Sequence, residues 1–317
     1  MRTMDLYANL HLHTVHSDGK YTPDEIVAVA KEEGYKAVAV TDHDTATAYP
    51  ELVVACEKAE MECIFGAEFS VLKPKDYHIT AYHFDPEYPP MKQYLADMGI
   101  RITDNTKHCF DEAVENGNIS GITWEEVLEY NRGIAWLCND HVFEAMLDKG
   151  LVERSEYMEW FKTNFSKQRK KYPPIKDFLE LREMIKLIHD AGGIALVAHP
   201  SGQLDDIDML IECGIDGMEV LHPCLDDDER NRAILIALEK DLYISGGSDH
   251  SGLCGGCYSG FASEEALKND PLYIPEMSAG TVFEFYEEIK KRTLNREYRE
   301  KLKEILKTQR YTDYMKK

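Results

Sequence analysis

A repeated alternation of short apolar runs with amphipathic segments constrains this chain of 317 residues more than any other feature. The run Ala37-Val38-Ala39-Val40 is apolar throughout, as expected of a parallel strand that is buried on both faces. It follows a helix that should begin at the capping box Thr22-Pro23-Asp24-Glu25 and end at Gly34. The same rhythm returns after residue 178. Repeated units of this kind predict parallel strands joined by right-handed crossovers.

Strands are predicted at the apolar runs, and helices between them. The expected strands cover residues 7–13, 37–40, 194–198, 217–221 and 242–245, with a further strand beginning at 63–65. The other helices of this framework are expected at residues 46–61, 178–191, 204–213 and 226–240. Six or seven strands favour an α/β fold of the irregular barrel type over an eight-stranded barrel. A doubly wound open sheet is the alternative, although no glycine-rich phosphate-binding fingerprint follows the first strand.

Residues 91–177 break this alternation. They contain predicted helices at 92–116, 124–130, 139–149 and 154–164. We interpret the segment as a helical subdomain inserted into a barrel that is formed by residues 1–90 and 178–317. Residues 262–317 should be mainly helical and close the barrel. The basic run Lys167, Arg169, Lys170 and Lys171 favours a solvated helix end over a phosphate site.

Net charge and hydropathy limit the kinds of molecule that we expect the chain to bind. The formal net charge of −22 argues against non-specific binding of a long polyanion. Three divalent ions would change it only to about −16, so a long nucleic acid would need a local basic path. Because no apolar stretch of about 18 residues occurs, we expect no membrane partner. The N-terminus lacks a signal peptide, which favours a cytoplasmic protein, and the oligomeric state stays open.

The eight cysteines indicate little chemistry of their own. Most lie in apolar segments, as small buried side chains do. Without a secretory signal we expect them to be reduced thiols. The pair Cys254 and Cys257 forms a lone CxxC, which could be redox-active or bind zinc, but has no second pair. We interpret it as a glycine-rich loop.

The strongest chemical signal is a set of metal-ligand residues at predicted strand ends. In His11-Leu12-His13 both imidazoles should project to one side, at the end where barrel enzymes place their sites. Four further strand ends carry the same residue types: Asp42-His43-Asp44, Glu68, His199 and Asp249-His250. If polar residues merely favoured strand ends, Ser, Asn and Gly would be as frequent there. Histidine with carboxylate suits zinc, manganese or iron(II).

With these residues the chain resembles the PHP family, the polymerase and histidinol phosphatase domain. The matching motifs, in order over residues 7–260, are His11-x-His13, Ser17-Asp18-Gly19, Thr41-Asp42-His43-Asp44, Gly66-x-Glu68, Ala198-His199-Pro200 and Gly247-Ser248-Asp249. The most similar branch contains a nucleoside 3′,5′-bisphosphate phosphatase and an RNA 5′-end-trimming exonuclease, and it has a helical insertion after the third strand. The resemblance implies a distorted TIM-like (β/α)7 barrel that holds two or three divalent metal ions (Mn²⁺, Fe²⁺ or Zn²⁺).

The resemblance also implies a set of metal ligands. They are His11, His13, Glu68 and Asp249 for one ion, Glu68 with His78 and His199 for a second, and Asp18 with His43 for a third. His250 departs from the pattern, because the family has its histidine two residues after the aspartate, where Ser251 stands here. His250 therefore reaches the third ion only if its loop bends. His83, on the opposite face of the strand of His78, is the reserve candidate, and Asp42 and Asp44 are expected to orient ligand histidines.

The activity implied by the resemblance is hydrolysis of a phosphate ester by a metal-bound hydroxide. The substrate would be a small nucleotide of the 3′,5′-bisphosphate type or the 5′ end of a short RNA or DNA. Catalytic roles fall to Glu68, His199 and Asp249, whereas no general acid is assigned and His222 is one candidate. Substrate contacts are expected from three residues of the insertion: Arg101, Asn139 and His141. Asn139 replaces the usual arginine and Asp140 adds a negative charge, and both weaken the case for a bisphosphate.

Three other functions compete with this hypothesis. An amidohydrolase-type C–N hydrolase also uses an HxH motif at the first barrel strand, but often has a carbamylated lysine or a histidine where Glu68 stands here. A histidinol-phosphatase-like enzyme would use the same chemistry on another substrate. A non-enzymatic metal-binding module is the third alternative, and the retention of so many ligand residues argues against it.

Overall fold

The computed structural model describes residues 6–166, 178–250 and 279–316. Several residues singled out in the sequence lie outside these ranges, namely the basic run from Lys167 to Lys171, Ser251, Cys254 and Cys257. Within the described ranges, no helix is both long and apolar enough to cross a membrane. The expectation of reduced thiols is wrong for Cys224, which is disulfide-bonded. No disulfide joins the other five described cysteines.

The N-terminal part of the chain forms a parallel sheet of three short strands, β1 (Ala8–Asn9), β2 (Ala37–Val38) and β3 (Glu62–Cys63). Ala8 lies opposite Ala37, and Ala37 lies opposite Glu62. Helix α1 (Pro23–Glu32) follows β1, and its capping box at Thr22 and Glu25 forms as predicted. Helix α2 (Tyr49–Ala59) follows β2. The predicted strand–helix alternation is confirmed here.

The second sheet has the order β4 (Gly66–Val71), β5 (Tyr77–Tyr82), β6 (Ile194–Val197), β7 (Gly217–Leu221) and β8 (Tyr243–Gly246). The prediction of parallel strands is wrong for β5, which runs antiparallel to both β4 and β6. Only residues 72–76 join β4 to β5, which is too short for a crossover, so the chain must reverse. Helices α7 (Leu181–Asp190), α8 (Ile207–Cys213, preceded by the 3₁₀ turn η3, Leu204–Asp206) and α9 (Asp227–Glu239) precede the last three strands.

Backbone contacts bring the edges of the two sheets together. The Leu10 N–H donates to the Gly246 carbonyl over 3.1 Å, and the Asp249 N–H donates to the His11 carbonyl over 2.9 Å. Single parallel bridges also join Leu12 to His250 and His43 to Glu68. The segments that follow β1 and β2 therefore lie beside those of β8 and β4. The predicted α/β class is confirmed, and the ligand-bearing strand ends share one region.

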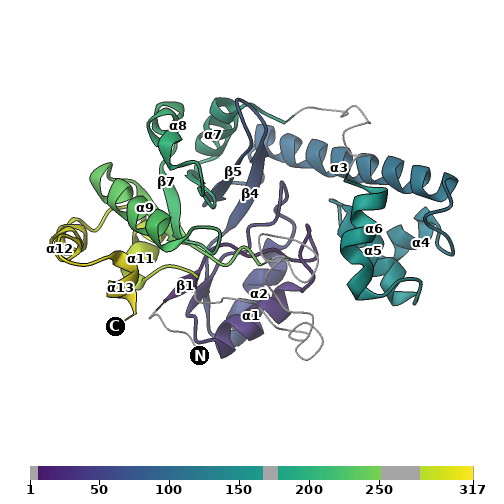
Figure 1. Ribbon diagram of the computed structural model, residues 1–317, viewed down its shortest axis with the longest axis horizontal. Helices are drawn as coiled ribbons and strands as arrows, with labels where there is room; N and C mark the ends of the chain where they lie inside the picture. Colours follow the sequence, from purple (N-terminus) through teal and green to yellow (C-terminus); the bar gives the residue numbers. More distant parts are fainter. Residues whose placement is uncertain (1–5, 167–177, 251–278, 317) are drawn as a thin grey trace.

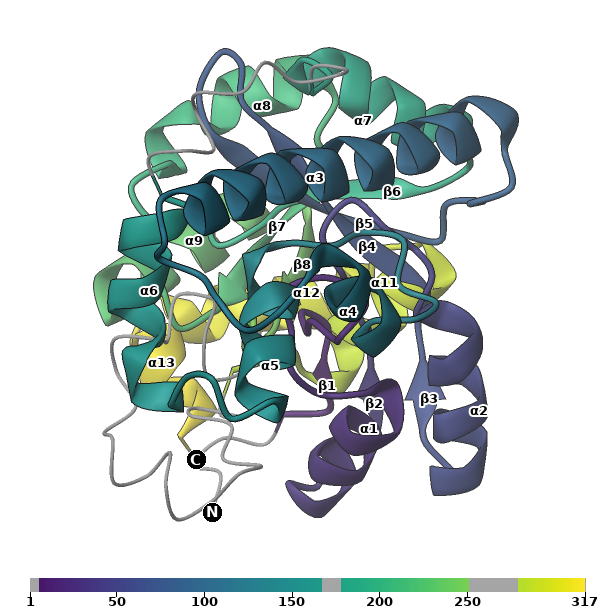
Figure 2. The same cartoon turned by 90° about the vertical axis from the view of Figure 1, so that its right-hand side faces the viewer.

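Residues 89–164 lie to one side of the sheets (Figure 1). They form α3 (Pro89–Glu115), α4 (Trp124–Tyr130), α5 (Asn139–Asp148), η1 (Arg154–Glu156) and α6 (Tyr157–Asn164), close to the predicted bounds. Seen from that side, α4 and α5 lie in front of the strands (Figure 2). An apolar cluster of their own, including Phe110, Val127, Phe143 and Trp160, holds these helices together. The start of α3 packs instead on the main core through Met91.

The chain ends in three helices, α11 (Phe283–Lys291), α12 (Arg296–Leu306) and α13 (Tyr311–Met315). Helix α11 packs against β8. A fully buried ion pair between Arg299 and Glu288 joins α12 to α11, and Arg299 also donates to the Leu242 carbonyl over 2.7 Å. The prediction of mainly helical structure near the C-terminus is confirmed for residues 283–315.

Candidate metal centre

The two histidines that follow β1 meet a glutamate and an aspartate from distant parts of the chain. His11 and His13 approach each other to 3.1 Å between their Nε2 atoms. Nε2 of His13 lies 3.0 Å from Oδ1 of Asp249 and 3.3 Å from Oε2 of Glu68. All four side chains are buried. The convergence predicted for these ligands of the first ion is therefore present.

Glycine permits the close approach of the chain segments at this point. A Cβ atom on Gly247 would lie 2.4 Å from both the backbone nitrogen and the Cβ of His11, closer than side chains tolerate. A Cβ on Gly19 would meet the backbone of His13 at 2.4 Å. Any other residue at either position would push the segments of His11 and Asp249, or of His13 and Asp18, apart.

Glu68 on β4 is the centre of the site, because both of its carboxylate oxygens face histidines. Its side chain is fully buried. Oε1 lies 3.0 Å from Nδ1 of His78 and 3.1 Å from Nε2 of His199. Oε2 faces three more imidazoles, at 3.3 Å from His11, 3.3 Å from His13 and 3.2 Å from His43. Asp18 adjoins this group at 3.5 Å from His13 and 3.6 Å from His43.

The mutual electrostatics of these groups are strong. Burial alone would lower the pKa of His11 and of His13, but nearby carboxylates outweigh it and hold both well above the ordinary value. Glu68 likewise raises the pKa of His78 to about 9 against the effect of burial. Burial dominates at His43 and lowers its pKa to about 3. Buried imidazoles and carboxylates so close together need protons or cations between them.

The donor set fits divalent metal ions. Within the described ranges of the chain, four groups offer ligand atoms within 4.8 Å of one another: His11, His13, Glu68 and Asp249; His13, Asp18 and His43; His43, Glu68 and His78; and His11, Glu219 and His222. Among the described residues, Nδ1 of His13, Nδ1 of His43 and Oε2 of Glu68 are buried without a hydrogen bond. Imidazole nitrogen and carboxylate oxygen suit zinc, manganese and iron(II), whose charge would satisfy these atoms.

Two ligand positions have unusual backbone conformations. His199 has φ 30° and Asp249 has φ 52°, both in the left-handed region that few residues other than glycine adopt, although asparagine, aspartate and histidine adopt it more often than the rest. His199 lies two residues after the end of β6, and Asp249 lies three residues after the end of β8. Strained backbone of this kind concentrates at functional sites.

His250 and His83 lie outside the cluster. The His250 ring stacks on Tyr21 with 5.5 Å between centroids, and it belongs to none of the metal-capable groups of the described residues. Burial lowers the pKa of His250 to about 3. Burial, and then the nearby Arg292 guanidinium, lower the pKa of His83, which also belongs to none of these groups.

The two aspartates beside His43 hold loops. Asp42 accepts hydrogen bonds from the Thr14 N–H at 2.7 Å and from the Ser17 hydroxyl at 2.6 Å. Asp44 accepts from the Ser70 N–H at 3.2 Å and from the Tyr94 hydroxyl at 3.3 Å. Neither contact orients a ligand histidine as the sequence analysis expected.

Glu219, in the middle of β7, was not among the residues predicted from the sequence. Its Oε1 lies 2.8 Å from Nδ1 of His11, and its Oε2 accepts the backbone N–H of His199 over 2.7 Å. A lone carboxylate in an otherwise apolar, buried strand was the available signal, because such a group needs partners. His222, the candidate general acid, is fully buried and lies behind the cluster, 3.6 Å from Asp249 and 3.8 Å from Glu219.

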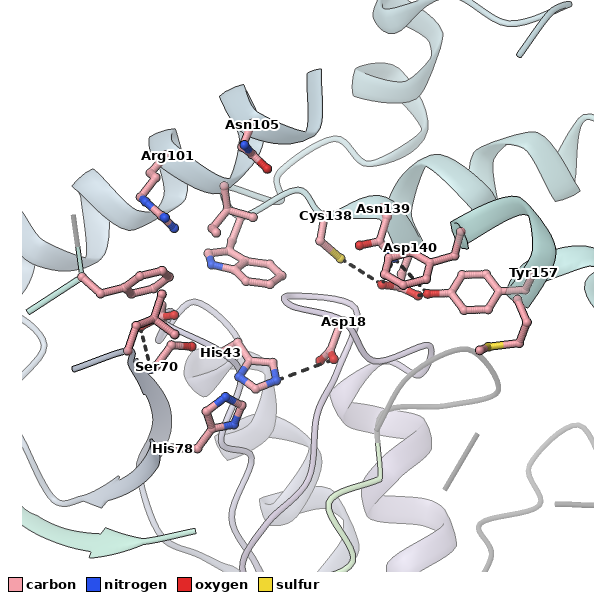
Figure 3. A pocket seen from close by; sticks show the side chains of 17 residues that line it. Asp18, His43, Ser70, His78, Arg101, Asn105, Cys138, Asn139, Asp140 and Tyr157 are labelled. Carbon is pink, nitrogen blue, oxygen red and sulfur yellow. Dashed lines mark hydrogen bonds and ion pairs between the residues drawn. The ribbon is translucent and has the colours of Figure 1, made fainter. Parts of the chain in front are cut away.

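A cavity of about 530 Å³ lies between the metal-ligand cluster and the helices of the insertion. Figure 3 shows Arg101 at one side of it and Asp140 with Tyr157 at the other, above His43 and Asp18. Aromatic side chains complete the walls: Trp136, Tyr157, Phe161 and Phe178. Trp136 lies over His43 with 6.2 Å between ring centroids.

The three predicted substrate contacts have different surroundings. Arg101 lines the cavity, and its guanidinium lies 4.0 Å from the centroid of the Phe178 ring. Asn139 also lines it, but its amide donates to Asp140 at 2.8 Å and to the Tyr157 hydroxyl at 2.9 Å. His141 lines a smaller neighbouring pocket instead. Its two ring nitrogens contact the Cys138 N–H at 3.0 Å and the Val15 carbonyl at 2.9 Å, which ties α5 to the β1 loop.

Comparisons with known proteins agree with this geometry. The PHP domain family matches residues 9–223. The chain is 27% identical over 256 residues to the phosphoribosyl 1,2-cyclic phosphate 1,2-diphosphodiesterase of Eggerthella lenta, covering 78% of this chain and 95% of that protein. It is 28% identical over 257 residues to the 5′-3′ exoribonuclease Rnm of Salmonella typhimurium, covering 78% and 85%. The 3′,5′-nucleoside bisphosphate phosphatase of Chromobacterium violaceum is 25% identical over 250 residues, covering 76% and 86%.

A solved structure is similar over nearly the whole chain. It comes from Bifidobacterium adolescentis and is described as a metal-dependent phosphoesterase. The TM-score is 0.71 at 26% sequence identity, and the likeness covers 92% of this chain and 98% of the other. The arrangement of sheets and insertion is therefore shared with a known structure.

Proposed function

Because the chain belongs to the PHP domain family, as its motifs predict, we propose that it is a metal-dependent phosphoesterase acting on a small nucleotide. Two or three divalent ions (Mn²⁺, Fe²⁺ or Zn²⁺) would be held by the residues of the centre. The names of the three relatives all describe cleavage of phosphate esters, in a phosphoribosyl cyclic phosphate, in RNA and in a nucleoside bisphosphate. A phosphate ester of one nucleotide, or the 5′ end of a short oligonucleotide, is the proposed substrate.

The observation that carries the proposal is the environment of Glu68. One buried carboxylate contacts five histidines from four separate parts of the chain, directly below a cavity with a guanidinium in its wall. A carboxylate with its two oxygens aimed at two ligand groups is suited to bridge two cations. This supports a multi-metal phosphoesterase over a decayed metal-binding module.

The residues of the centre and those of the cavity wall have different proposed roles. Divalent ions, when bound, acidify water and neutralise the charge that develops on phosphoryl oxygens. Glu68, Asp249 and His199 would hold the ions at the bottom of the cavity, beside the phosphate of the substrate. Arg101 would pair with a second anionic group of the substrate, since it is the one Lys or Arg side chain among the described cavity-lining residues. The aromatic walls would exclude water and pack against a base or sugar.

The walls of the cavity favour a mononucleotide over a long chain. Among the described lining residues, three carboxylates, those of Asp18, Asp44 and Asp140, stand against the one guanidinium of Arg101. Asp140 is buried against Tyr157 and Asn139 at the side opposite Arg101 (Figure 3). A polyanion leaving by that side would meet negative charge, so the substrate should carry its second anionic group toward Arg101.

The two sheets are proposed to form one distorted (β/α)7 barrel, with residues 91–177 as a capping subdomain. The supporting contacts are the backbone hydrogen bonds between the segments of β1 and β8 and the bridge between His43 and Glu68. The separate apolar cluster of the insertion supports its treatment as a subdomain. The ties of His141 to Val15 and of Cys138 to Ser17 support its position over the metal ligands.

The proposal is tested by hydrolysis assays on the purified protein loaded with manganese, zinc or iron(II). The substrates are a nucleoside 3′,5′-bisphosphate, a short 5′-phosphorylated RNA, histidinol phosphate and an amide. We expect phosphate release from the nucleotide and no cleavage of the amide. Release from histidinol phosphate alone would establish the competing phosphatase, and amide cleavage alone would establish a C–N hydrolase.

Replacing one proposed metal ligand tests whether activity depends on the metal centre, apart from the stability of the fold. His13→Ala should lower kcat/KM by a factor of about 1,000 or more, because one residue of two metal-capable groups is lost. The matched control is His108→Ala, which removes a half-exposed histidine of α3 that contacts Asp104. Unchanged activity in a folded His13→Ala protein would disprove the assigned centre.

A further inference from the structure

Glu219 is the middle residue of β7, a strand in which no metal ligand was predicted. Its side chain has no solvent exposure, and neither has that of His11. The pairing of β7 with β8 is irregular between Glu219 and Leu221, where the register shifts. Such irregularities often re-aim a side chain beside an active site. Here the carboxylate points into the layer directly behind the metal-ligand histidines.

The contacts of Glu219 determine which ring nitrogen of His11 carries the proton. Oε1 lies 2.8 Å from Nδ1 of His11, so an ionised Glu219 accepts a hydrogen bond from Nδ1–H. A neutral His11 that carries its proton on Nδ1 has a lone pair on Nε2. That atom lies 3.3 Å from Glu68 and 3.5 Å from Asp249, in the group of four ligands. The carboxylate thus selects the tautomer that can bind a metal.

The second oxygen of Glu219 anchors a different ligand. Oε2 accepts the backbone N–H of His199 over 2.7 Å, at the residue whose φ is 30°. This hydrogen bond stabilises a positive-φ backbone conformation that is uncommon for residues other than glycine. The His199 ring then reaches Oε1 of Glu68 at 3.1 Å. One carboxylate therefore positions ligands that follow β1 and β6.

His222 completes this layer behind the ligands. Its Nδ1 accepts the Cys224 N–H over 3.1 Å, which leaves the proton of a neutral ring on Nε2. Nε2 points between Glu219 and Asp249, at 3.8 Å and 3.6 Å. Glu219 therefore faces the His11 ring, the His199 N–H and the His222 ring.

We propose that Glu219 is a positioning residue of the metal centre, which fixes the Nδ1–H tautomer of His11 and the turn at His199. This inference rests on the metal centre of the proposed function. It goes beyond the expected ligand set, because Glu219 acts through two ligands that belong to different ions in that set.

The test compares metal binding by wild type, Glu219→Gln and Glu288→Gln. Glutamine keeps the size of the side chain, but its NH₂ group must face either the His11 N–H or the His199 N–H. We expect Mn²⁺ or Zn²⁺ to bind about 10- to 100-fold more weakly to Glu219→Gln, measured by titration calorimetry and metal content. Glu288 is equally buried but pairs with Arg299 and contacts no metal ligand, so its variant should keep wild-type affinity for the metal.

A second measurement needs no variant. Long-range ¹H–¹⁵N spectra of the wild-type protein loaded with Zn²⁺ report which ring nitrogen of each histidine carries a proton, and His11 should carry its proton on Nδ1. Glu219→Asp, which keeps the charge and shortens the reach, should weaken metal binding even if Glu219→Gln does not fold. Wild-type affinity in a folded Glu219→Gln protein, or an Nε2–H tautomer of His11, would overturn the inference.

These outcomes are independent of the substrate. If the wild-type protein binds metal and shows the predicted tautomer but hydrolyses no phosphate ester, the proposed function fails and the role of Glu219 stands. If it hydrolyses nucleotides while Glu219→Gln binds metal as wild type does, only the role of Glu219 fails.

Discussion

The metal-ligand floor and the helical roof of the cavity are built in different ways. The floor consists of side chains at strand ends, each held by backbone hydrogen bonds between neighbouring segments and by glycines at close contacts. The roof consists of helices α3 to α6, which pack on one another through their own apolar cluster. Few polar ties join the two, among them the His141 contact to Val15.

From this difference we infer that the floor carries out the chemistry and that the roof determines which substrate is bound. The floor has little freedom to vary, because each ligand contacts several others and a displaced group would leave buried charge unpaired. The roof lines the cavity through side chains on helix surfaces, such as Arg101 and Asp140. A roof can change its surface without disturbing the ligands below it, which fits the different substrates named for the three relatives.

The largest expected effect is on stability, which should change differently for mutations in the roof and in the floor. Phe143 is fully buried in the roof cluster, and Phe143→Ala should destabilise the roof by about 3–5 kcal/mol. We expect earlier thermal unfolding and loss of substrate binding, while the metal content per chain stays at the wild-type value. Calorimetry and elemental analysis provide the measurements.

The matched control places the same change in the floor. Phe69 is equally buried, but it lies on β4 next to Glu68. Phe69→Ala should lower both stability and metal content. Equal metal loss in the two variants would show that roof and floor form one cooperative unit, against the comparison drawn here.

A smaller expected effect is the pH dependence of stability and metal affinity, which arises from the proton that His78 holds beside Glu68. In the metal-free protein the pKa of His78 is raised to about 9 by Glu68, so this pair stabilises the fold fully below pH about 6.5 and loses its contribution as the pH rises through about 9. Metal must displace that proton, so its apparent affinity should increase by about 10-fold per pH unit for each proton displaced.

Titration calorimetry at pH 6, 7 and 8, in buffers of different ionisation enthalpy, measures both affinity and proton release. The melting temperature gained on adding metal should therefore increase with pH. A metal affinity that does not change over this range would contradict the proton competition expected at the floor. The same pH series with a roof variant should show an unchanged slope.

The smallest expected effect tests the charge of the roof. Arg101→Gln should raise KM for a nucleoside bisphosphate by about 10-fold with little change in kcat, because one charge-assisted contact to the second anionic group is lost. KM for a substrate with a single phosphate should change less. Steady-state kinetics on the two substrates measure the difference.

Asp140→Asn is the matched variant at the opposite side of the cavity. Removal of its negative charge should lower KM for the bisphosphate, in the opposite direction to Arg101→Gln. If both variants raise KM equally, the cavity has no charge polarity and the preferred orientation of the substrate is wrong.

The sequence by itself determined the residue types and the positions of most of the floor. His11 and His13 alternate along a strand, and His43, Glu68, His199 and Asp249 each follow an apolar run, so their convergence could be predicted from the geometry of strand ends. Helix starts were also predictable, because the capping boxes at Thr22, before the insertion, and at Thr123, within it, mark them locally.

Only the tertiary structure decided which of these groups touch. His250 turns to Tyr21 although it adjoins Asp249, and the reversal of β5 brings His78 to Glu68 across an antiparallel pair. Glu219 is a single acidic residue in an apolar strand, and its partners come from two other strands. Sequence patterns record which face of an element is buried, but the identity of a buried partner depends on contacts between distant segments, which no local pattern contains.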